Sequence, residues 1–284
     1  MNISREVNKE FNFLKPLQFD KLVRLGNKND GGYVVPCDLT KKTDILISFG
    51  YGYDPSFEYD YINFTKKKTY VYDYTSNIFF LIKVFLKYFK RFITFRKKLK
   101  DVIYHLNNIK KHLQFINHKM INFKKKRIVP SKSNNENIYF ESHSAGELPL
   151  IKKDITVKQI FDKLNYNNIF LKCDIEGSEY LIIDDILEYK DKIDVMAFEF
   201  HWTDKNIDVF VKSVKKLQKH FSIIHIHANN HEPLIDKINI PIVPEITFVN
   251  NKYLKEKKYI TNFPRKNLDY PNNINSEDLY FHFN

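Results

Sequence analysis

The segment NIFLKCDIEGSEY (168–180) carries the clearest fold signal in this chain. It begins with a short apolar run and continues into a turn at Gly177, a pattern that is typical of a buried strand. Apolar residues then recur at helical spacing over 181–187, so we expect a helix directly after the turn. Asp174 and Glu176 therefore lie at or just past the carboxyl end of a central strand. Ligands bind at that end in open α/β sheets.

Carboxylates at the end of an apolar strand need a partner, because burying an unpaired charge is costly. A metal ion, a cationic cofactor or a proton-transfer role would each supply one, and we expect such a role for Asp174. Glu176 and Glu179 have a structural alternative. They can open the next helix, where negative charge favours the helix dipole. For Glu179 this structural role is the prediction.

A second turn motif, SFGYGYD, follows a predicted strand at 44–50 and leads into a predicted helix. It places Gly50 and Gly52 on either side of Tyr51, and glycine at such a turn lets a ligand approach the backbone closely. The next predicted strand, 68–75, carries Asp73 about 20 residues later, where an acid hydrogen-bonds the ribose of a nucleotide cofactor. These four residues predict a site for an adenosine-containing cofactor. The alternative is that Asp73 only caps its own loop.

An earlier segment, 22–36, has two apolar runs separated by Asp30, Gly31 and Gly32. Such spacing predicts a hairpin with a tight turn, and we expect it to cover one edge of the domain. Asp30 and Gly31 are further candidates for cofactor contacts.

Predicted strands and helices alternate through the second half of the chain. The strands are expected at 138–146, 168–174, 194–202, 221–233 and 244–250. The helices are expected at 154–164, with Asp154 as N-cap, and at 204–220. This alternation predicts an α/β fold with a mostly parallel sheet and helices on both of its faces.

Polar side chains follow three successive strands of this predicted sheet: Asp174, then Glu199 and His201, then His227 and Asn230. If these strands are neighbours, the side chains meet at one rim. Carboxylate, imidazole and amide groups together suit Mg or Mn, so Asp174, His201, His227 and Asn230 are the predicted metal ligands. The alternative makes His201 a general base that Asp174 or Glu199 orients, with no metal. Both alternatives make Asp174, Glu199 and His201 the candidate catalytic residues.

The formal net charge of +12 is concentrated in one segment, 76–127, which contains 15 Lys/Arg and one acid, Asp101. That segment carries +14, which leaves −2 for the rest of the chain. Its apolar residues recur at helical spacing, so we predict one or two amphipathic basic helices inserted into a domain formed by 1–75 and 128–284. The insertion could cap the site, pair with a second subunit, lie on an anionic membrane surface or simply be a solvated layer.

The cysteine content and the N-terminus predict a cytoplasmic protein. Cys37 and Cys173 are far apart and form no disulfide framework, which suits a reducing compartment. The N-terminus has no apolar core of a signal peptide. The most apolar stretch, 78–95, is interrupted by four basic residues and is not expected to span a membrane.

Five segments resemble the FkbM family of S-adenosylmethionine-dependent methyltransferases. They are RLGNKNDGGYVV (24–35), SFGYGYDPSFE (48–58), LKCDIEGSEY (171–180), FEFHW (198–202) and HIHANN (225–230). The resemblance covers about residues 20–75 and 135–250, and LKCDIEGSEY is its most specific part. It implies a Rossmann-like class I methyltransferase fold of seven strands, with a hairpin of the last two strands near 221–250. It also implies that the Gly50–Gly52 turn contacts the methionine end of S-adenosylmethionine and that Asp73 contacts the ribose.

The same resemblance implies methylation of a sugar hydroxyl on a nucleotide-activated sugar or a surface-polysaccharide precursor. The basic insertion replaces a short connection in the family, so the acceptor and the oligomeric state stay open, including a homo-oligomer formed through the insertion. Two alternatives use its charge: a nucleic-acid methyltransferase and a non-catalytic protein of the membrane surface. The first is disfavoured because the chain lacks the Asn-Pro-Pro-aromatic motif that enzymes methylating amino groups of nucleic acids often carry.

Overall fold

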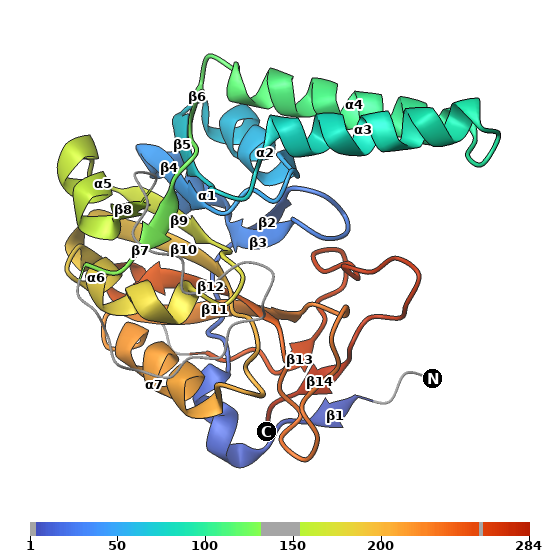
Figure 1. Ribbon diagram of the computed structural model, residues 1–284. Helices are drawn as coiled ribbons and strands as arrows, with labels where there is room; N and C mark the ends of the chain where they lie inside the picture. The colour runs from blue at the N-terminus through green and yellow to red at the C-terminus, as the bar shows by residue number, and fades with distance from the viewer. Residues whose placement is uncertain (1–3, 132–153, 256–257) are drawn as a thin grey trace.

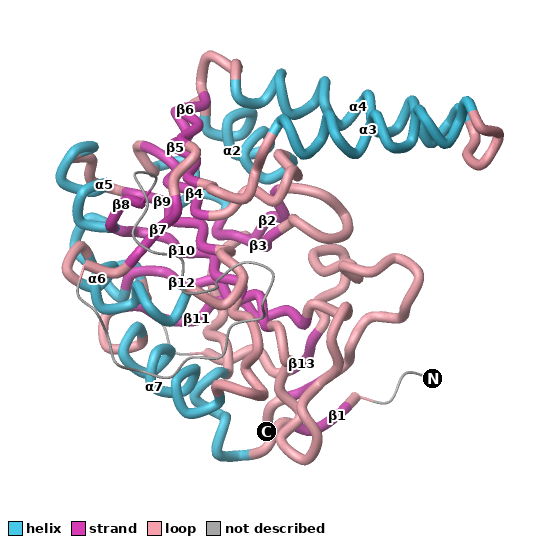
Figure 2. Tube along the Cα trace, in the orientation of Figure 1, coloured by secondary structure: helices cyan, strands magenta, loops and turns pink. Residues whose placement is uncertain are grey.

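The computed structural model describes residues 4–131, 154–255 and 258–284 (Figures 1 and 2). Its strands are β1 (Arg5–Glu6), β2 (Leu22–Leu25), β3 (Tyr33–Pro36), β4 (Ile45–Phe49), β5 (Lys68–Tyr72), β6 (Ile121–Lys124), β7 (Arg127–Val129), β8 (Asp154–Thr156), β9 (Ile169–Cys173), β10 (Ile193–Glu199), β11 (Phe221–Ala228), β12 (Pro244–Asn250), β13 (Asn262–Phe263) and β14 (Phe281–His282). Its α-helices are α1 (Cys37–Lys42), α2 (Ser56–Thr65), α3 (Ile78–Ile93), α4 (Leu99–Ile116), α5 (Val157–Leu164), α6 (Ile183–Leu187) and α7 (Ile207–Leu217). Short 3₁₀ turns are η1 (Lys9–Leu14), η2 (Glu179–Ile182), η3 (Lys190–Lys192) and η4 (Asn251–Tyr253).

A seven-stranded sheet forms the centre of the molecule, in the order β11-β12-β10-β9-β4-β5-β6. Only β12 runs antiparallel to its neighbours, and it forms the expected hairpin with β11. The remaining neighbours pair in parallel. The predicted α/β class, with seven mostly parallel strands in a Rossmann-like sheet, is confirmed.

The central strands are buried on both faces, which explains their continuous apolar sequences. Every residue of β4 and β9 is buried. Residues of α5, α6 and α7 pack in one apolar cluster against one face, and residues of α1 and α2 pack in another cluster against the opposite face. The predicted placement of helices on both faces is therefore also confirmed, and Figure 1 shows the two layers.

The chain leaves β4 toward β5 and β6 on one side, and then returns to place β9 and β10 on the other side. The strand order therefore reverses between β4 and β9. A crevice outside the carboxyl ends of the strands at such a reversal is the usual ligand site of open α/β sheets. The backbone N–H of Asp174 donates to the carbonyl oxygen of Phe49 across this point at 3.0 Å.

The hairpin of β2 and β3 forms as predicted, but it does not cover an edge of the sheet. Tyr33 and Val35 pack in one cluster with residues of five strands of the central sheet, and the Thr247 hydroxyl of β12 donates to the carbonyl oxygen of Val34 at 2.7 Å. The hairpin thus lies across a face. Its apolar residues are buried there together with those of the central strands.

The basic segment forms two long antiparallel helices, α3 and α4, that project from the body of the molecule (Figure 1). The predicted insertion, 76–127, extends too far, because it includes β6. That strand pairs in parallel with β5 and completes the sheet. The added helical part therefore ends with α4 at Ile116.

Three further details differ from the sequence prediction or lie beyond it. Asp154 does not cap α5. It pairs through both carboxylate oxygens with Arg127, while Thr156 accepts the N–H of Gln159 as the N-cap. The strand predicted at 138–146 lies outside the described residues. The C-terminal segment, which had no predicted element, forms β13 and β14 in a small sheet with β1.

Candidate active site

The turn after β4 depends on its two glycines in different ways. Gly50 has φ +81°, and a Cβ there would collide with the carbonyl oxygen of Asp174. Gly52 has φ +55°, and a Cβ there would meet no atom within 4 Å. Gly50 is thus required for the contact between the ends of β4 and β9. Gly52 instead leaves open space beside the backbone, as a bound ligand needs.

Asp73 holds this turn with both carboxylate oxygens. Oδ2 accepts the backbone N–H groups of Tyr51 and Gly52, at 3.0 and 3.1 Å, and the Ser76 hydroxyl. Oδ1 accepts the backbone N–H groups of Thr75 and Ser76 and the Thr75 hydroxyl. Burial alone would raise the pKa of Asp73, but these hydrogen bonds lower it below its ordinary value. The carboxylate is therefore ionised at neutral pH.

Six donors exceed the roughly four lone-pair positions of a carboxylate. Asp73 thus caps its own loop, as the alternative reading of the sequence proposed. A ribose contact at Asp73 stays a prediction, and such a contact requires one of the two hydroxyls, on Thr75 or Ser76, to give up its hydrogen bond.

A pocket opens beside this turn at the reversal of strand order. It is lined by Gly50, Gly52, Tyr72, Asp73, Tyr74, Thr75, Lys126, Arg127, Ile128, Asp174, Ile175, Glu176 and Ser178. We call it the turn pocket. Of the predicted cofactor residues it contains Gly50, Gly52 and Asp73. Exposed backbone, ring faces and an apolar wall at Ile128 suit a nucleoside, so the residues present fit an adenosine-containing cofactor.

A second pocket, the acidic pocket, adjoins the first. Its lining is Asp30, Gly31, Tyr51, Gly52, Asp54, Phe57, Lys172, Asp174, Glu176, Glu199, His201, Trp202, Asn229, His231, Glu232 and Val243. The two pockets share Gly52, Asp174 and Glu176. Asp30, Gly31 and Tyr51, which we predicted to contact the cofactor, line the acidic pocket instead. Asp30 and Gly31 do so because the loop of the β2–β3 hairpin reaches across the face of the sheet, and Tyr51 does so from the turn after β4.

His201 lies close to three carboxylates at the acidic pocket. Its Nδ1 lies 3.0 Å from the buried carboxylate of Glu179, and its Nε2 lies 3.5 Å from Glu176 and 4.0 Å from Asp174. Burial would lower the pKa of His201, but the charge and hydrogen bond of Glu179, together with Glu199 and Asp174, raise it well above its ordinary value. The imidazole therefore carries a proton at neutral pH.

Glu179 opens η2, as predicted, and its carboxylate has a second role. Its carboxylate accepts the N–H groups of Ile175 and Gly177 and contacts the His201 ring, so it fixes both the turn and the imidazole. Glu176 has φ +55° and Trp202 has φ +57°. Non-glycine residues in this left-handed region are uncommon and concentrate at functional sites.

Lys172, which lines the acidic pocket, and the buried Tyr33 bind acids of this pocket, and the sequence identified neither residue. The buried Lys172 ammonium donates to the carbonyl oxygen of Gly50 at 3.0 Å and to Asp174 at 3.4 Å. The Tyr33 hydroxyl lies 3.3 Å from Asp174 and 3.1 Å from Glu199. Burial, followed by the charge of Asp174, raises the pKa of Glu199 well above its ordinary value. Lys172 could have been noted as a charged residue inside an apolar strand.

The predicted metal ligands do not all come together. His227 lies between the carboxylates of Glu245 and Asp278, which engage its two ring nitrogens. The Asn230 side chain binds backbone groups of the C-terminal segment, among them the N–H of Asn273. The prediction was wrong for these two residues because β12 and the C-terminal segment bind their side chains, whereas the neighbouring Asn229 reaches Glu199 at 2.7 Å.

In the part of the chain that the structure describes, two groups of acidic or histidine side chains lie close enough together to hold a cation. Ligand atoms of Asp174, Glu176 and His201 lie within 4.8 Å of one another, as do those of Asp30, Glu199 and Glu245. Only the first group includes an imidazole with a carboxylate behind it, a common arrangement around metal ions in proteins. Among the described residues, this group can hold Mg or Mn, with Glu176 in place of the two predicted ligands.

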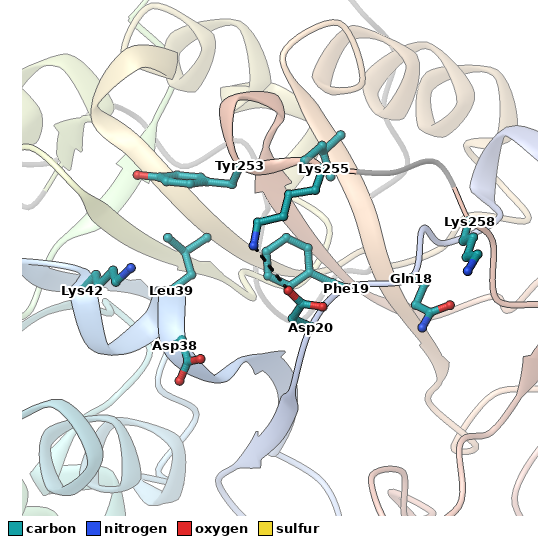
Figure 3. Close-up of a pocket in the computed structure, with 10 residues that line it drawn as sticks. Gln18, Phe19, Asp20, Asp38, Leu39, Lys42, Tyr253, Lys255 and Lys258 are labelled. Atoms are coloured by element: carbon teal, nitrogen blue, oxygen red, sulfur yellow. Dashed lines mark ion pairs between the residues drawn. The ribbon is translucent and has the colours of Figure 1, made fainter.

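A further hollow lies at the opposite edge of the sheet, among α1, η4 and the segment before β2 (Figure 3). Lysines and acids are mixed there, and Lys255 reaches Asp20 at 3.8 Å. Both of these side chains are largely in solvent. The amino-terminal edge of a parallel sheet is also not where such folds place ligands, so we assign no site to it.

Comparisons with known proteins place this chain in no family. No family model matches it, and no curated protein matches it. Similar solved structures include an rRNA methylase from Streptococcus thermophilus, with 10% identity, a TM-score of 0.36 and coverage of 75% of this chain and 92% of that one.

Two further similar structures have comparable scores. The fibrillarin pre-rRNA processing protein of Methanococcus jannaschii has 8% identity, a TM-score of 0.35 and coverage of 74% and 68%. A precorrin-6y C5,15-methyltransferase from Geobacter metallireducens has 10% identity, a TM-score of 0.33 and coverage of 75% and 86%. These likenesses are distant, so the fold assignment rests on the strand order.

Proposed function

We propose that this protein transfers a methyl group from S-adenosylmethionine to a sugar hydroxyl, as an enzyme similar to the FkbM family. The observation that carries the proposal is the junction of the two pockets. Gly52, Asp174 and Glu176 belong to both pockets, at the reversal point where open α/β sheets bind nucleotides. A donor in the turn pocket and an acceptor in the acidic pocket would therefore meet there.

The turn pocket would hold the cofactor, which supplies an electrophilic methyl group on a sulfonium. Gly52 leaves room beside the backbone, and Asp73 keeps the turn in shape. The nearby charges of Asp174 and Glu176 suit the cationic sulfonium. Alignment of the two reacting groups is the main contribution that such a site makes to the rate.

The acidic pocket favours an uncharged polyhydroxy acceptor. Six acids line it: Asp30, Asp54, Asp174, Glu176, Glu199 and Glu232. Carboxylates accept hydrogen bonds from hydroxyl groups, whereas they repel phosphate. We infer that a sugar ring enters the pocket and that a phosphate-bearing carrier, such as a nucleotide, stays outside it. The same repulsion argues against a nucleic-acid backbone at this site.

His201 would take the proton from the acceptor hydroxyl or hold a metal ion that polarises that hydroxyl. Glu179 fixes the imidazole with Nε2 toward Glu176, which suits both roles. Because the ring is protonated at neutral pH, a base role requires deprotonation first. A divalent cation at Asp174, Glu176 and His201 would compete with that proton and deprotonate the ring on binding.

The proposal is tested by calorimetric titration with S-adenosylhomocysteine, followed by transfer of a labelled methyl group to a panel of nucleotide sugars. We expect binding and at least one methylated sugar. Absence of binding would contradict the cofactor assignment, and binding without transfer to any sugar would contradict the acceptor class. Turnover after exhaustive chelation would identify His201 as the base, whereas turnover restored only by Mg or Mn would identify the metal role.

A further inference from the structure

The projecting hairpin of α3 and α4 has an apolar surface beyond the one that joins its helices. Leu81 of α3 is buried, and Tyr88 of α3 lies on His105 of α4 with ring centroids 4.0 Å apart. Most of the exposed apolar side chains of the hairpin form a second set: Phe79, Ile82, Leu86, Phe89, Ile93, Leu99, Ile103, Leu106 and Leu113. Phe80, Phe95 and Tyr104 are also exposed but do not share the spacing of this set. We call this set the outer stripe.

The outer stripe is continuous over both helices. On α3 its residues recur three or four positions apart, and on α4 they recur four, three and seven positions apart. On both helices they lie about a quarter turn beyond the contact surface, in the direction of increasing residue number. Antiparallel helices turn in opposite senses when viewed from one end. The two halves of the stripe therefore fall on the same side of the hairpin.

Exposed apolar area of this extent is unusual for a protein surface without a partner. Leu86 is 55% exposed and Ile93 is 60% exposed. The lysines of α3, at Lys83, Lys87 and Lys90, are exposed beside the stripe. The whole of 78–116 contains ten Lys/Arg and one acid.

We propose that the outer stripe docks on an anionic lipid bilayer, with its apolar side chains in the interface and the lysines against the headgroups. Amphipathic helices with a basic flank and aromatic or aliphatic residues on the other side bind in this way. No helix among the described residues is both long and apolar enough to cross a bilayer, so the hairpin would lie in the plane of the surface. The proposal does not depend on the methyl transfer proposed above.

The charge of the hairpin distinguishes a bilayer from a second copy of the chain. Two hairpins packed through their stripes would bring two strongly positive flanks together, with one acid, Asp101, on each hairpin to offset them. An anionic surface offers the opposite charge. The phosphate backbone of a nucleic acid would bind the lysines but would leave the apolar stripe without a partner.

The inner end of the hairpin contacts the candidate active site. Phe115 of α4 stacks on Tyr51 with ring centroids 4.3 Å apart and an angle of 10° between the rings. Tyr51 belongs to the glycine turn and lines the acidic pocket. Docking of the hairpin would therefore place the acidic pocket near the membrane surface.

The experiment is co-sedimentation of the full-length protein with vesicles of phosphatidylcholine alone and of phosphatidylcholine with phosphatidylglycerol. We expect binding only to the anionic vesicles, and weaker binding at high salt. The triple variant K83E/K87E/K90E should lose about a hundredfold in partitioning. The matched control K42E/K255E/K258E changes the net charge equally at the opposite edge of the sheet and should keep most of the binding.

A second variant separates apolar docking from simple charge attraction. L86D/F89D should lose at least tenfold in partitioning, while the control I274D, at another exposed apolar residue, should not. Circular dichroism and thermal unfolding confirm that each variant is folded. Three results would overturn the proposal: no preference for anionic vesicles, equal losses in variant and control, or a dimer in sedimentation equilibrium that L86D/F89D dissociates.

Discussion

The turn pocket and the acidic pocket share three residues but are built in different ways. The turn pocket depends on backbone geometry, with two glycines and a carboxylate that binds N–H groups within one β-turn-α-β unit. The acidic pocket is built from side chains that five separate segments contribute, from the β2–β3 hairpin to the loop after β11. A site that is built from backbone groups can be disrupted by a single Cβ added at a glycine. A site that is built from side chains should lose part of its activity with each substitution, while the fold stays intact.

The largest effect is expected for Gly50→Ala, with Gly52→Ala as its control. A Cβ on Gly50 collides with the backbone between β4 and β9, so the variant should lose several kcal/mol of stability and all measurable cofactor binding. Gly52 has free space, so its variant should lose only about 1 kcal/mol from backbone strain. Urea unfolding with calorimetry measures both. Equal stability of the two variants would show that the contact between the strand ends is not tight.

The next effect concerns the imidazole of the acidic pocket. His201→Gln should lower kcat by roughly 10²–10⁴-fold, because it removes the proton acceptor or metal ligand. Affinity for S-adenosylhomocysteine should change little, since His201 does not line the turn pocket. Glu179→Gln should give a smaller loss of kcat and a shifted pH profile, because Glu179 only positions the ring. A parallel loss of cofactor affinity in His201→Gln would mean that the two pockets are not separable.

Asp73→Asn should weaken cofactor binding by roughly tenfold to a hundredfold, measured by calorimetry. An amide places an N–H₂ group where at least two N–H or O–H donors now point, and leaves those donors unpaired. Asp20→Asn, an exposed acid at the opposite edge, is the control. If affinity stays at the wild-type level, the glycine turn holds its shape without Asp73.

The smallest effect is the pH dependence of stability. His201 has a folded pKa raised above its ordinary value near 6.5. Its stabilising contribution is therefore fully present below pH 6.5 and is lost as the pH rises through the folded pKa. The stability difference between wild type and His201→Gln should be larger at pH 6 than at high pH, by about 1.4 kcal/mol per unit of pKa shift. A difference that grows with pH would mean that the ring is neutral in the folded protein.

Local patterns were enough to predict most central strands, though not β6, and the position of the glycine turn. The apolar runs of β4 and β9 are buried on both faces, so their sequences read as continuous strands, and Gly50 and Asp73 lie at the strand ends where the spacing placed them. These features depend on residues that are near one another in the chain. Their physical causes, backbone conformation and apolar periodicity, are visible in a short segment.

The acidic pocket depended on the order of strands in space, which no local pattern encodes. Partners in β12 and the C-terminal segment bind His227 and Asn230, while the turn after β9 brings Glu176 and Glu179 to His201. Lys172 gained its role because β9 pairs with β4, and Tyr33 gained its role because the β2–β3 hairpin packs against the end of β9. The amino-acid sequence thus specified which chemical groups stand at strand ends. Tertiary packing decided which of them meet, because charge–charge contacts are set by distances across the sheet rather than along the chain.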